Sequence, residues 1–434
     1  MKIAGIIAEY NPFHNGHLYQ ITETKKQTGA DRIVVVMSGD FVQRGAPAIV
    51  SKYARARMAL SCGANLVLEL PVMYATGSAE YFAQGAVSLL QQLGTVDLLS
   101  FGSECGEICF LQQAADLLLQ ESDHFRYLLQ QQMREGHSYP EARLYALKAT
   151  ADTQRLVSLT RALSSPNNIL GIEYCKALAR LNSSIVPFTL RRQDSGYHHQ
   201  TLSSAAASAL NVPPSSATVP DSDIRLSSAT AIRHTLLDHV QNDSDIASVL
   251  ASHVPNESLS LLLAAARQEL FLDWSDFASL LHYKLLSEQE QGYLSYLDVS
   301  PDLSDKIGKY LNQFTTVEAF IHLLKSKDLT YTRISRSLLH ILLNIHQAAP
   351  TAMSVPYARI LGFQKDTSDL LTQLKKQSQI PLISKLADAA SYLEADAKAV
   401  LQQDILASHI YESVASQKSG TPFQNEYTRQ MIIL

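Results

Sequence analysis

Short apolar runs recur along the first half of the chain, and longer stretches with apolar residues at helical spacing separate them. Such runs are typical of buried parallel strands, which are apolar on both faces. The intervening stretches, such as 52–61 and 78–93, are long enough to form crossover helices. Strands that alternate with helices predict an α/β fold with a parallel sheet. The predicted strands are residues 3–8, 33–37, 65–70, 96–102 and 184–190.

The pattern changes beyond about residue 240, where β-branched runs become sparse and helical spacing dominates. With 434 residues and 46% hydrophobic content, the chain is too long for one compact domain. We therefore predict an α/β domain over 1–240 and an all-α domain over 241–434. The Ser/Ala/Pro-rich stretch 202–220 is predicted to be irregular. The clearest helical patterns of the second half lie at 259–271, 275–286, 303–314 and 317–325.

The first apolar run ends in polar residues that suit phosphate binding. Asn11-Pro12 supplies a turn after the strand, and a helix is predicted to begin near Gly16. The first N–H groups of a helix have no partners within it and attract phosphate. His14 and His17 share one face of the turn, and Gly16 lets a nucleotide approach the backbone. Because open α/β sheets bind ligands at the carboxyl ends of their strands, we predict a nucleoside triphosphate site with both histidines as catalytic residues.

The loop after the second strand lies at the same edge of the sheet and supplies two more predicted catalytic residues. Asp40 could hold Mg²⁺ or orient a nucleophile, and the alternative is that it caps the turn after Gly39. Arg44 could hold a substrate carboxylate or a phosphate through two hydrogen bonds. Lys52 and Arg55 in the next helix could neutralise pyrophosphate, or they could form the solvated face of that helix.

Four strings of the chain resemble the tRNA(Met) cytidine acetate ligase family, within the superfamily of His-x-Gly-His nucleotidyltransferases. They are residues 8–17, 37–45, 165–174 and 195–198. The resemblance implies a Rossmann-like catalytic domain followed by a helical domain that binds tRNA. It implies an enzyme that activates acetate with ATP as acetyl-adenylate and acetylates the wobble cytidine of elongator tRNA(Met) to N4-acetylcytidine, releasing AMP and pyrophosphate. ATP, acetate and this tRNA are then its partners, Mg²⁺ is expected with the ATP, and no stable protein partner is predicted.

The resemblance extends the ATP site to residues far from the first run. It implies that the amide of Asn167, a residue well placed to cap a helix, reads ATP. Gly102 lets the backbone pass close to the adenosine, and the alternative is that residues 101–103 only turn a corner. Arg192 is the predicted contact after the fifth strand, with Arg191 as the alternative, because neighbouring side chains alternate along a strand. Residues 226–233 resemble the Ser-Ser-x-x-Ile-Arg helix start that lies beside the triphosphate in many members of the superfamily. The alternative is that Ser227 and Ser228 only cap the helix, which does not explain Arg233. The predicted ATP-binding residues are Ile7, Ala8, Glu9, Tyr10, Asn11, Pro12, Phe13, His14, Asn15, Gly16, His17, Leu18, Tyr19, Gln20, Gly102, Asn167, Arg192, Ser227, Ser228 and Arg233.

Charge neither requires nor excludes RNA binding. The formal net charge is -5, but tRNA affinity depends on a local basic patch. Solvated basic residues on a helix are the alternative interpretation of every candidate in the second half. The candidate tRNA contacts are Lys325, Lys327, Arg333, Arg336 and Arg359, with Tyr331 and Tyr357 as stacking partners for an extruded base.

Cysteine content and apolar spans suggest a cytoplasmic protein. The four cysteines are too few and too irregularly spaced for a disulfide framework, so we expect reduced thiols. Cys105 and Cys109 have no matching Cys or His pair nearby, so we predict no metal site held by the protein. The N-terminus lacks the pattern of a signal peptide, and no apolar span is long enough to cross a membrane.

Two other functions could use the same residues. A small-molecule adenylyltransferase of the pantetheine-phosphate or nicotinate type would use both histidines, but such compact enzymes do not account for the long second half. A non-catalytic tRNA-binding protein with a vestigial ATP site is the other alternative, and the intact His14, Gly16 and His17 argue against it. The Lys-Met-Ser-Lys-Ser loop of class I aminoacyl-tRNA synthetases is absent from the sequence, which argues against that class.

Overall fold

The computed structural model describes residues 1–119, 123–137, 141–142, 145–146, 149, 165–192, 202, 225–238, 243–347 and 354–434. The string at 195–198, and all of the stretch 202–220 except its first residue, lie outside the described residues. None of the described helices combines the length and the apolar character needed to cross a membrane.

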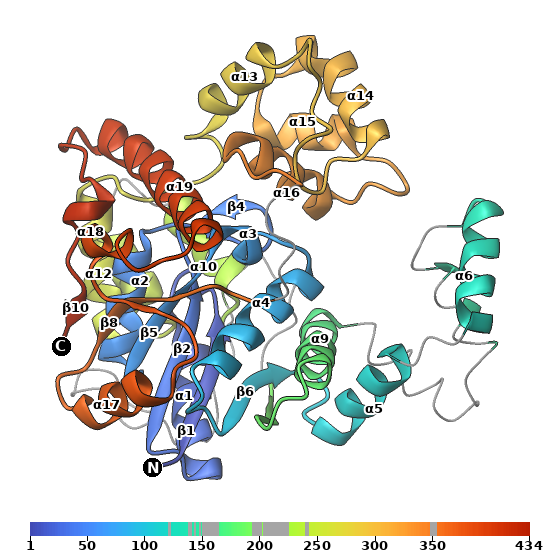
Figure 1. Cartoon of the computed structure of the whole chain (residues 1–434). Coiled ribbons are helices and arrows are strands. Elements are labelled where there is room, and N and C mark those ends of the chain that lie inside the picture. Colours follow the sequence, from blue (N-terminus) through green and yellow to red (C-terminus); the bar gives the residue numbers. More distant parts are fainter. Residues whose placement is uncertain are drawn as a thin grey trace.

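One sheet forms the centre of the protein, with strand order β10-β8-β5-β2-β1-β6-β7 (Figure 1). β1 lies between β2 and β6, and β5 and β7 extend the parallel arrangement on either side. The five predicted strands are therefore confirmed, and their order, with the third strand at one side and the fifth at the other, is that of a Rossmann-like sheet. These strands are β1 (Ile3–Ala8), β2 (Arg32–Ser38), β5 (Leu66–Leu70), β6 (Leu98–Ser103) and β7 (Val186–Arg191).

Helices cover both faces of this sheet, because alternate residues of each central strand point to opposite faces. Ile3, Ile7 and Val36 belong to one buried core, and Ile6 and Val35 belong to the other. Residues of α4, α5 and α9 contribute to the first core, whereas residues of α1, α2 and α10 contribute to the second. The helices of this part of the chain are α1 (Asn15–Thr28), α2 (Lys52–Ser61), α3 (Val72–Ala75), α4 (Ala79–Gln92), α5 (Ile108–Leu119), α6 (Asp123–Arg134), α9 (Pro166–Arg180), α10 (Ala229–Asp238), α11 (Asp243–Leu250) and α12 (Asn256–Arg267).

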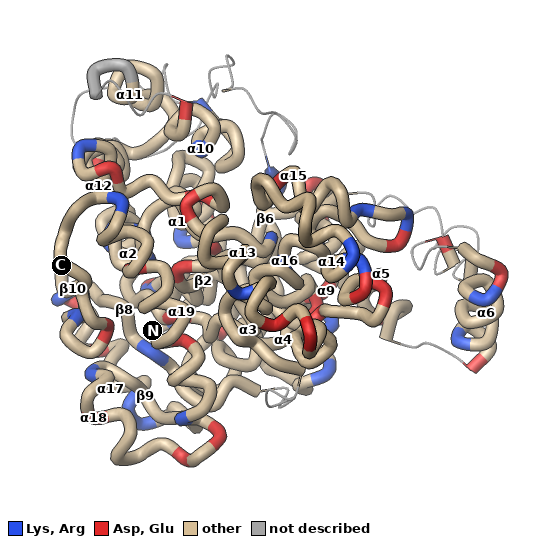
Figure 2. Tube along the Cα trace, turned by 90° about the horizontal axis from the view of Figure 1, so that it is seen from above, with Lys and Arg blue, Asp and Glu red and all other residues tan. Residues whose placement is uncertain are grey.

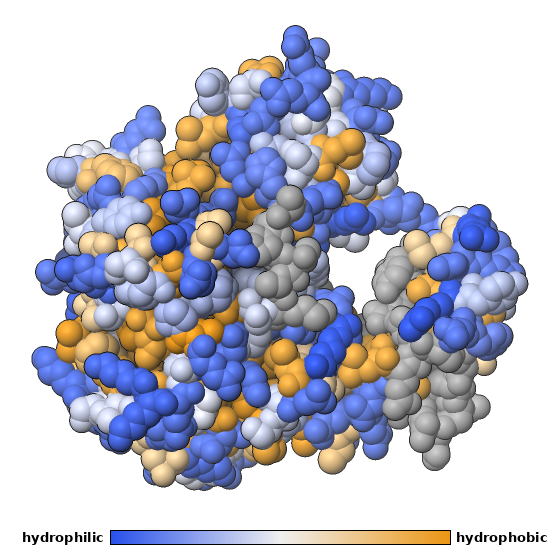
Figure 3. Space-filling view, in the orientation of Figure 1, coloured by the Kyte–Doolittle hydropathy of each residue, from blue (hydrophilic) through white to orange (hydrophobic). Residues whose placement is uncertain are grey.

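A helical unit lies beyond the carboxyl ends of the parallel strands (Figure 1). It comprises α13 (Ala278–Ser287), α14 (Pro301–Tyr310), η2 (Leu311–Gln313), α15 (Val317–Leu324) and α16 (Tyr331–Leu342). The last of these helices contacts a short antiparallel hairpin formed by β3 (Phe41–Val42) and β4 (Ala46–Pro47). In Figure 3 the surface of this unit is mostly hydrophilic.

The prediction that residues 241–434 are all helical is wrong for three short strands. β8 (Ala358–Phe363) pairs antiparallel with β5, and β9 (Leu382–Ile383) and β10 (Ile432–Ile433) pair with β8. β8 carries a short apolar run, but the strand that it joins is far away in the sequence, so local periodicity does not reveal the pairing. The remaining elements are α17 (Ser368–Gln377), α18 (Leu386–Ala389), α19 (Ala395–Ser419) and η3 (Glu426–Thr428).

Buried charges fix this C-terminal segment to the α/β part. Lys52 at the start of α2 places Nζ 2.8 Å from Glu69 Oε1 and 2.6 Å from Glu426 Oε1. Arg359 of β8 completes the group, with Nη1 2.8 Å from Glu69 Oε2 and Nη2 2.5 Å from Glu426 Oε1. All four residues are buried. We call these four residues the ionic cluster.

Candidate active site

A cavity of about 400 Å³ opens at the carboxyl ends of β1, β6 and β7. Its lining comes from the end of β1 and the turn after it, the start of α1, the β3–β4 hairpin, the N-termini of α9 and α10, and α16. The cavity lies where the strand order reverses between β1 and β6, the place at which open α/β sheets bind ligands. Its volume is in the range of small-ligand sites.

His14 and His17 line the cavity and form the N-terminal cap of α1 together. His14 Nδ1 accepts a hydrogen bond from the Gly16 N–H at 3.1 Å, and His17 Nδ1 accepts one from the His14 N–H at 3.2 Å. The two rings are stacked, with centroids 3.7 Å apart. Because each Nδ1 is an acceptor, each neutral ring carries its proton on Nε2. Both histidines can therefore donate an Nε2–H hydrogen bond to a ligand.

Burial keeps both imidazoles in the neutral form. Together with the charges of Arg192 and Arg233, burial lowers the pKa of His14 to about 3. Burial also holds the pKa of His17 well below its usual range, assisted by His14 and Arg192. At neutral pH the pair therefore offers hydrogen-bond donors without a positive charge, and the positive charge of the lining comes from the arginines.

We expect the ring nitrogens of His14 and His17 to show the neutral Nε2–H tautomer in ¹H–¹⁵N spectra from pH 8 down to pH 5. An unperturbed imidazole has a pKa of about 6.5 and becomes mostly protonated over this range. Assignment with His14→Gln and His17→Gln spectra identifies the two rings. Ring ¹⁵N chemical shifts typical of imidazolium at pH 6, for either histidine, would contradict the neutral tautomers. Since the folded protein resists protonation here, the stability that these rings contribute is lost as pH falls from about 6.5 toward 3.

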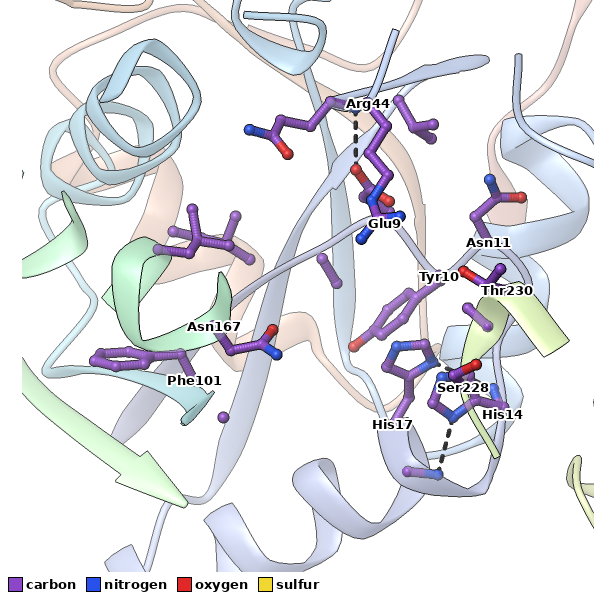
Figure 4. A pocket seen from close by; sticks show the side chains of 18 of the residues that line it. Glu9, Tyr10, Asn11, His14, His17, Arg44, Phe101, Asn167, Ser228 and Thr230 are labelled. Atoms are coloured by element: carbon purple, nitrogen blue, oxygen red, sulfur yellow. Dashed lines mark hydrogen bonds between the residues drawn. The ribbon is translucent and has the colours of Figure 1, made fainter. Parts of the chain in front are cut away.

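Most of the residues predicted to bind ATP meet in this cavity (Figure 4). They come from five separate segments of the chain. The predicted residues that line the cavity are Ile7, Ala8, Glu9, Tyr10, Asn11, His14, Gly16, His17, Tyr19, Gln20, Gly102, Asn167, Arg192, Ser228 and Arg233, together with Arg44. The predicted ATP-binding residues outside the lining are Pro12, Phe13, Asn15, Leu18 and Ser227.

Three of the residues outside the lining make contacts behind the cavity, and the predicted contact of the five with ATP stays a prediction. Phe13 is fully buried. Asn15 Nδ2 donates a hydrogen bond to the Ser252 carbonyl at 2.8 Å. The Ser227 hydroxyl lies 2.9 Å from His253 Nδ1. These contacts hold the start of α1 and the segment before α10 in place.

Asp40 is buried outside the cavity, so its predicted catalytic role is corrected. Its Oδ1 accepts a hydrogen bond from the Lys52 backbone N–H at 2.8 Å, and its Oδ2 lies 3.7 Å from Lys52 Nζ. Lys52 therefore provides a partner for both oxygens of the Asp40 carboxylate at the start of α2. Among the described residues, no group of three or more His, Cys, Asp or Glu side chains is arranged to hold a metal ion.

Lys52 and Arg55 are also withdrawn from the site, contrary to both interpretations of the sequence. Lys52 belongs to the ionic cluster. Arg55 is fully buried, and its guanidinium donates to the carbonyls of Glu9 at 2.7 Å and Ser38 at 3.0 Å, and to that of Gly39. Neither side chain is available to pyrophosphate or to solvent.

Both Arg191 and Arg192 line the cavity, so the prediction that only one of them faces the site is wrong. β7 ends at Arg191, and alternation along the strand no longer constrains the next residue. Arg192 Nη1 donates to Asn167 Oδ1 at 3.3 Å. A Cβ at Gly102 would lie 3.2 Å from Arg192 Cγ, so the glycine leaves room for this arginine.

At the start of α10, Ser228 caps the helix and Arg233 contacts the turn that precedes α1. Ser228 Oγ accepts a hydrogen bond from the Ala231 N–H at 3.1 Å, as a capping residue does. Arg233 Nη1 donates to the Asn11 carbonyl at 2.7 Å. Figure 4 shows Ser228 and Thr230 on the histidine side of the cavity, with Asn167 across from them.

Several lining residues were not predicted from the sequence. Some adjoin predicted residues, as Gln43 adjoins Arg44, and could have been found from that position. Trp274 is the single tryptophan of the chain, a signal that could have been used. Others enter from elements that only the fold brings close. The lining residues in question are Val42, Gln43, Ala46, Pro47, Phe82, Phe101, Leu170, Tyr174, Leu190, Leu226, Ala229, Thr230, Trp274 and Ser335.

The tRNA candidates separate into exposed and buried residues. Lys325 and Lys327 are exposed after α15, and Arg333 and Arg336 are partly exposed on α16. Arg336 Nε donates to Asp298 Oδ2 at 3.0 Å. Figure 2 shows basic and acidic positions interspersed over the helices at this end of the protein. None of these contacts excludes an RNA partner at the exposed positions.

Arg359 and Tyr357 are buried, which corrects their predicted contact with tRNA. Arg359 pairs with Glu69 and Glu426 in the ionic cluster. The Tyr357 hydroxyl donates to a carboxylate oxygen of Asp404. Tyr331, the other stacking candidate, lines the cavity.

The chain is similar to known proteins over its whole length. The family model described as HIGH Nucleotidyl Transferase matches residues 1–219 and 212–426. A tRNA(Met) cytidine acetate ligase from Acetivibrio thermocellus is 38% identical over the full length of both chains. A protein of the same name from Caldanaerobacter subterraneus subsp. tengcongensis is 38% identical over 95% of each chain.

A solved structure shares the whole fold. The crystal structure of Thermotoga maritima TmcAL bound with alpha-thio ATP superposes with a TM-score of 0.84 at 27% identity and covers all of both chains. The apo form of the same protein gives a TM-score of 0.86. The likeness in sequence and in structure extends over both the α/β part and the helical unit. The chain therefore belongs to the tRNA(Met) cytidine acetate ligase family.

Proposed function

We propose that this protein activates acetate with ATP and transfers the acetyl group to N4 of the wobble cytidine of elongator tRNA(Met), with release of AMP and pyrophosphate. The observation that carries the proposal is the pair of neutral histidines at the start of α1, held with Nε2–H donors available to the cavity. The names of the full-length relatives support it, as does the alpha-thio ATP bound to the Thermotoga protein.

In the first step, an acetate oxygen attacks the α-phosphorus of ATP in line with the leaving pyrophosphate. Charge builds on the phosphate oxygens, where His14, His17 and the N–H groups at the start of α1 stabilise it. Arg44 lines the same cavity and is our candidate for holding the acetate carboxylate. Mg²⁺ enters with ATP as its counter-ion. Positioning and charge stabilisation suffice, and no covalent enzyme intermediate is needed.

In the second step, the exocyclic amine of cytidine attacks the carbonyl carbon of acetyl-adenylate and expels AMP. We propose that the helical unit holds the tRNA, with Lys325, Lys327 and Arg333 as contacts at its exposed positions. A small-molecule adenylyltransferase gives no role to this unit, and the full-length relatives carry the ligase name.

The proposed function is tested by following acetate and ATP in one reaction. Purified protein is incubated with ATP, Mg²⁺, ¹⁴C-acetate and bacterial tRNA, and the RNA is digested to nucleosides. We expect label in N4-acetylcytidine that depends on ATP and is greatly reduced in His17→Asn. Unlabelled RNA, with AMP joined to a phosphorylated metabolite, would instead establish the adenylyltransferase.

A further inference from the structure

Glu9 is the only carboxylate among the described residues that line the cavity. It follows β1 directly and lies on the same wall as Arg44 (Figure 4). Four arginines line the same space: Arg44, Arg191, Arg192 and Arg233. These suit the anions ATP and acetate, whereas a carboxylate repels them. The role of Glu9 therefore concerns a ligand with hydrogen-bond donors.

Two contacts fix the position of Glu9. Its Oε1 accepts a hydrogen bond from the Gln43 backbone N–H at 3.0 Å. Its carbonyl accepts one from Arg55 Nη1 at 2.7 Å, so the buried arginine holds the backbone at this point. The described part of the chain provides no hydrogen bond to the second carboxylate oxygen, Oε2. That oxygen is available to a ligand in the cavity.

Aromatic side chains line the neighbouring wall. Trp274 Nε1 donates to the Gly45 carbonyl at 2.9 Å and lies 3.2 Å from Ser335 Oγ, which joins the β3–β4 hairpin to α16. Tyr331, in the first turn of α16, lines the same cavity. Gly45 fits closely here, because a Cβ would lie 2.4 Å from the Arg336 nitrogen. The β3–β4 hairpin therefore contacts both the acidic acceptor, through Gln43, and an aromatic ring, through Gly45.

A cytosine base matches this combination. Its exocyclic amine is a donor that Glu and Asp side chains accept, and an extruded base stacks on aromatic rings. The arginines suit the phosphates of ATP, whereas the carboxylate and the rings suit an uncharged base with an amine donor. The helical unit, our proposed tRNA support, contacts the same hairpin through α16.

We propose, on the basis of the function proposed above, that Glu9 is the general base of acetyl transfer and that Tyr331 stacks on the cytosine that accepts the acetyl group. The N4 nitrogen forms a bond to the carbonyl carbon of acetyl-adenylate. The bond from that carbon to the phosphate oxygen breaks, and AMP leaves with the electron pair. The proton lost from N4 passes to Glu9 Oε2 and then to solvent. No oxidant, reductant or further reactant is required.

The test separates the two chemical steps in Glu9→Gln. Acetate-dependent exchange of pyrophosphate into ATP measures the first step. Synthetic acetyl-adenylate supplied with tRNA measures the second step without ATP. Glutamine keeps an acceptor oxygen for the Gln43 N–H but takes no proton, so we expect acetyl transfer to fall by about 100-fold or more, as for loss of a general base. Exchange is expected to change by a much smaller factor.

Glu290→Gln is the matched control. Glu290 is exposed between α13 and α14, and the substitution removes the same charge. An equal loss of exchange and transfer in Glu9→Gln would assign Glu9 to ATP binding and overturn the proposal. Unchanged transfer would overturn it as well. If the wild-type protein forms no N4-acetylcytidine, the proposed function itself fails, a result that is distinct from either outcome in the variant.

The stacking role has its own test. Tyr331→Leu removes the ring and is expected to raise KM for tRNA in the transfer reaction about ten-fold or more, because loss of base stacking weakens binding by that order. Tyr331→Phe retains the ring and restores KM. If KM for tRNA is unchanged in both variants, or rises equally in both, stacking on this ring does not hold the base.

Discussion

Replacing His17 with asparagine lowers acetate-dependent ATP–pyrophosphate exchange by about 10²–10³-fold, the effect expected when one donor to a developing charge is lost. The asparagine Oδ1 takes the place of His17 Nδ1 and still accepts the hydrogen bond from the His14 N–H. The Nε2–H donor has no counterpart in asparagine. The variant therefore keeps the cap of α1 and loses the donor to phosphate.

His17→Gln is the matched variant, because the glutamine amide nitrogen reaches the place of Nε2. We expect it to recover part of the exchange rate, whereas the amide oxygen is badly placed for the cap. Circular dichroism and the unfolding midpoint report whether α1 remains intact. Full exchange activity in His17→Asn would show that the donor does not contribute to adenylate formation.

Replacing Lys52 with methionine is expected to destabilise the protein by ~3–5 kcal/mol, the usual cost of removing one partner from a buried ion pair. Lys52 Nζ lies within 2.8 Å of Glu69 and Glu426 carboxylate oxygens, and all three residues are buried. Without the lysine, Arg359 alone faces two buried carboxylates. Urea denaturation followed by circular dichroism measures the shift, with Lys365→Met as an exposed control that loses the same charge.

Protonation of the ionic cluster is also expected to lower the stability of the protein at acid pH. Burial alone would raise the pKa of Glu426, but the charges of Lys52 and Arg359 outweigh it and lower that pKa to about 2. The unfolded carboxyl has a pKa of about 4.3. The stabilisation from Glu426 is therefore complete above about pH 5 and is lost as pH falls toward 2. Lys52→Met should make unfolding less dependent on pH in this window. A wild-type unfolding midpoint in the variant would show that the cluster contributes nothing.

The parallel sheet could be predicted from the sequence because its strands are buried on both faces. Continuous apolar runs follow directly from that burial, and the five runs give the strands and their order along the chain. The antiparallel strand β8 escaped prediction although it contains an apolar run. Its partner β5 is remote in sequence, and nothing local to residues 358–363 specifies that pairing.

The burial of charged residues was likewise not predictable from the sequence. Lys52, Arg55 and Arg359 have the chemistry of phosphate contacts, and their sequence positions at a helix start and a strand are compatible with exposure. Burial depends on which acidic groups and carbonyls meet them, and these come from separate elements. Glu426 reaches Lys52 only because the C-terminal segment packs against α2.

The sequence by itself determined the histidine turn, since His14, Gly16 and His17 lie within four consecutive residues and one helix start holds them all. The spacing fixes which groups cap the helix, and capping fixes the tautomer. Tertiary structure alone decided the rest of the cavity. It placed Arg191, at the end of β7, and Arg192, directly after it, in the lining, and it brought Trp274 and Tyr331 into the same cavity as Glu9. The physical reason is that local hydrogen bonds follow from neighbouring residues, whereas burial and the lining of a cavity depend on the packing of segments that are distant in the chain.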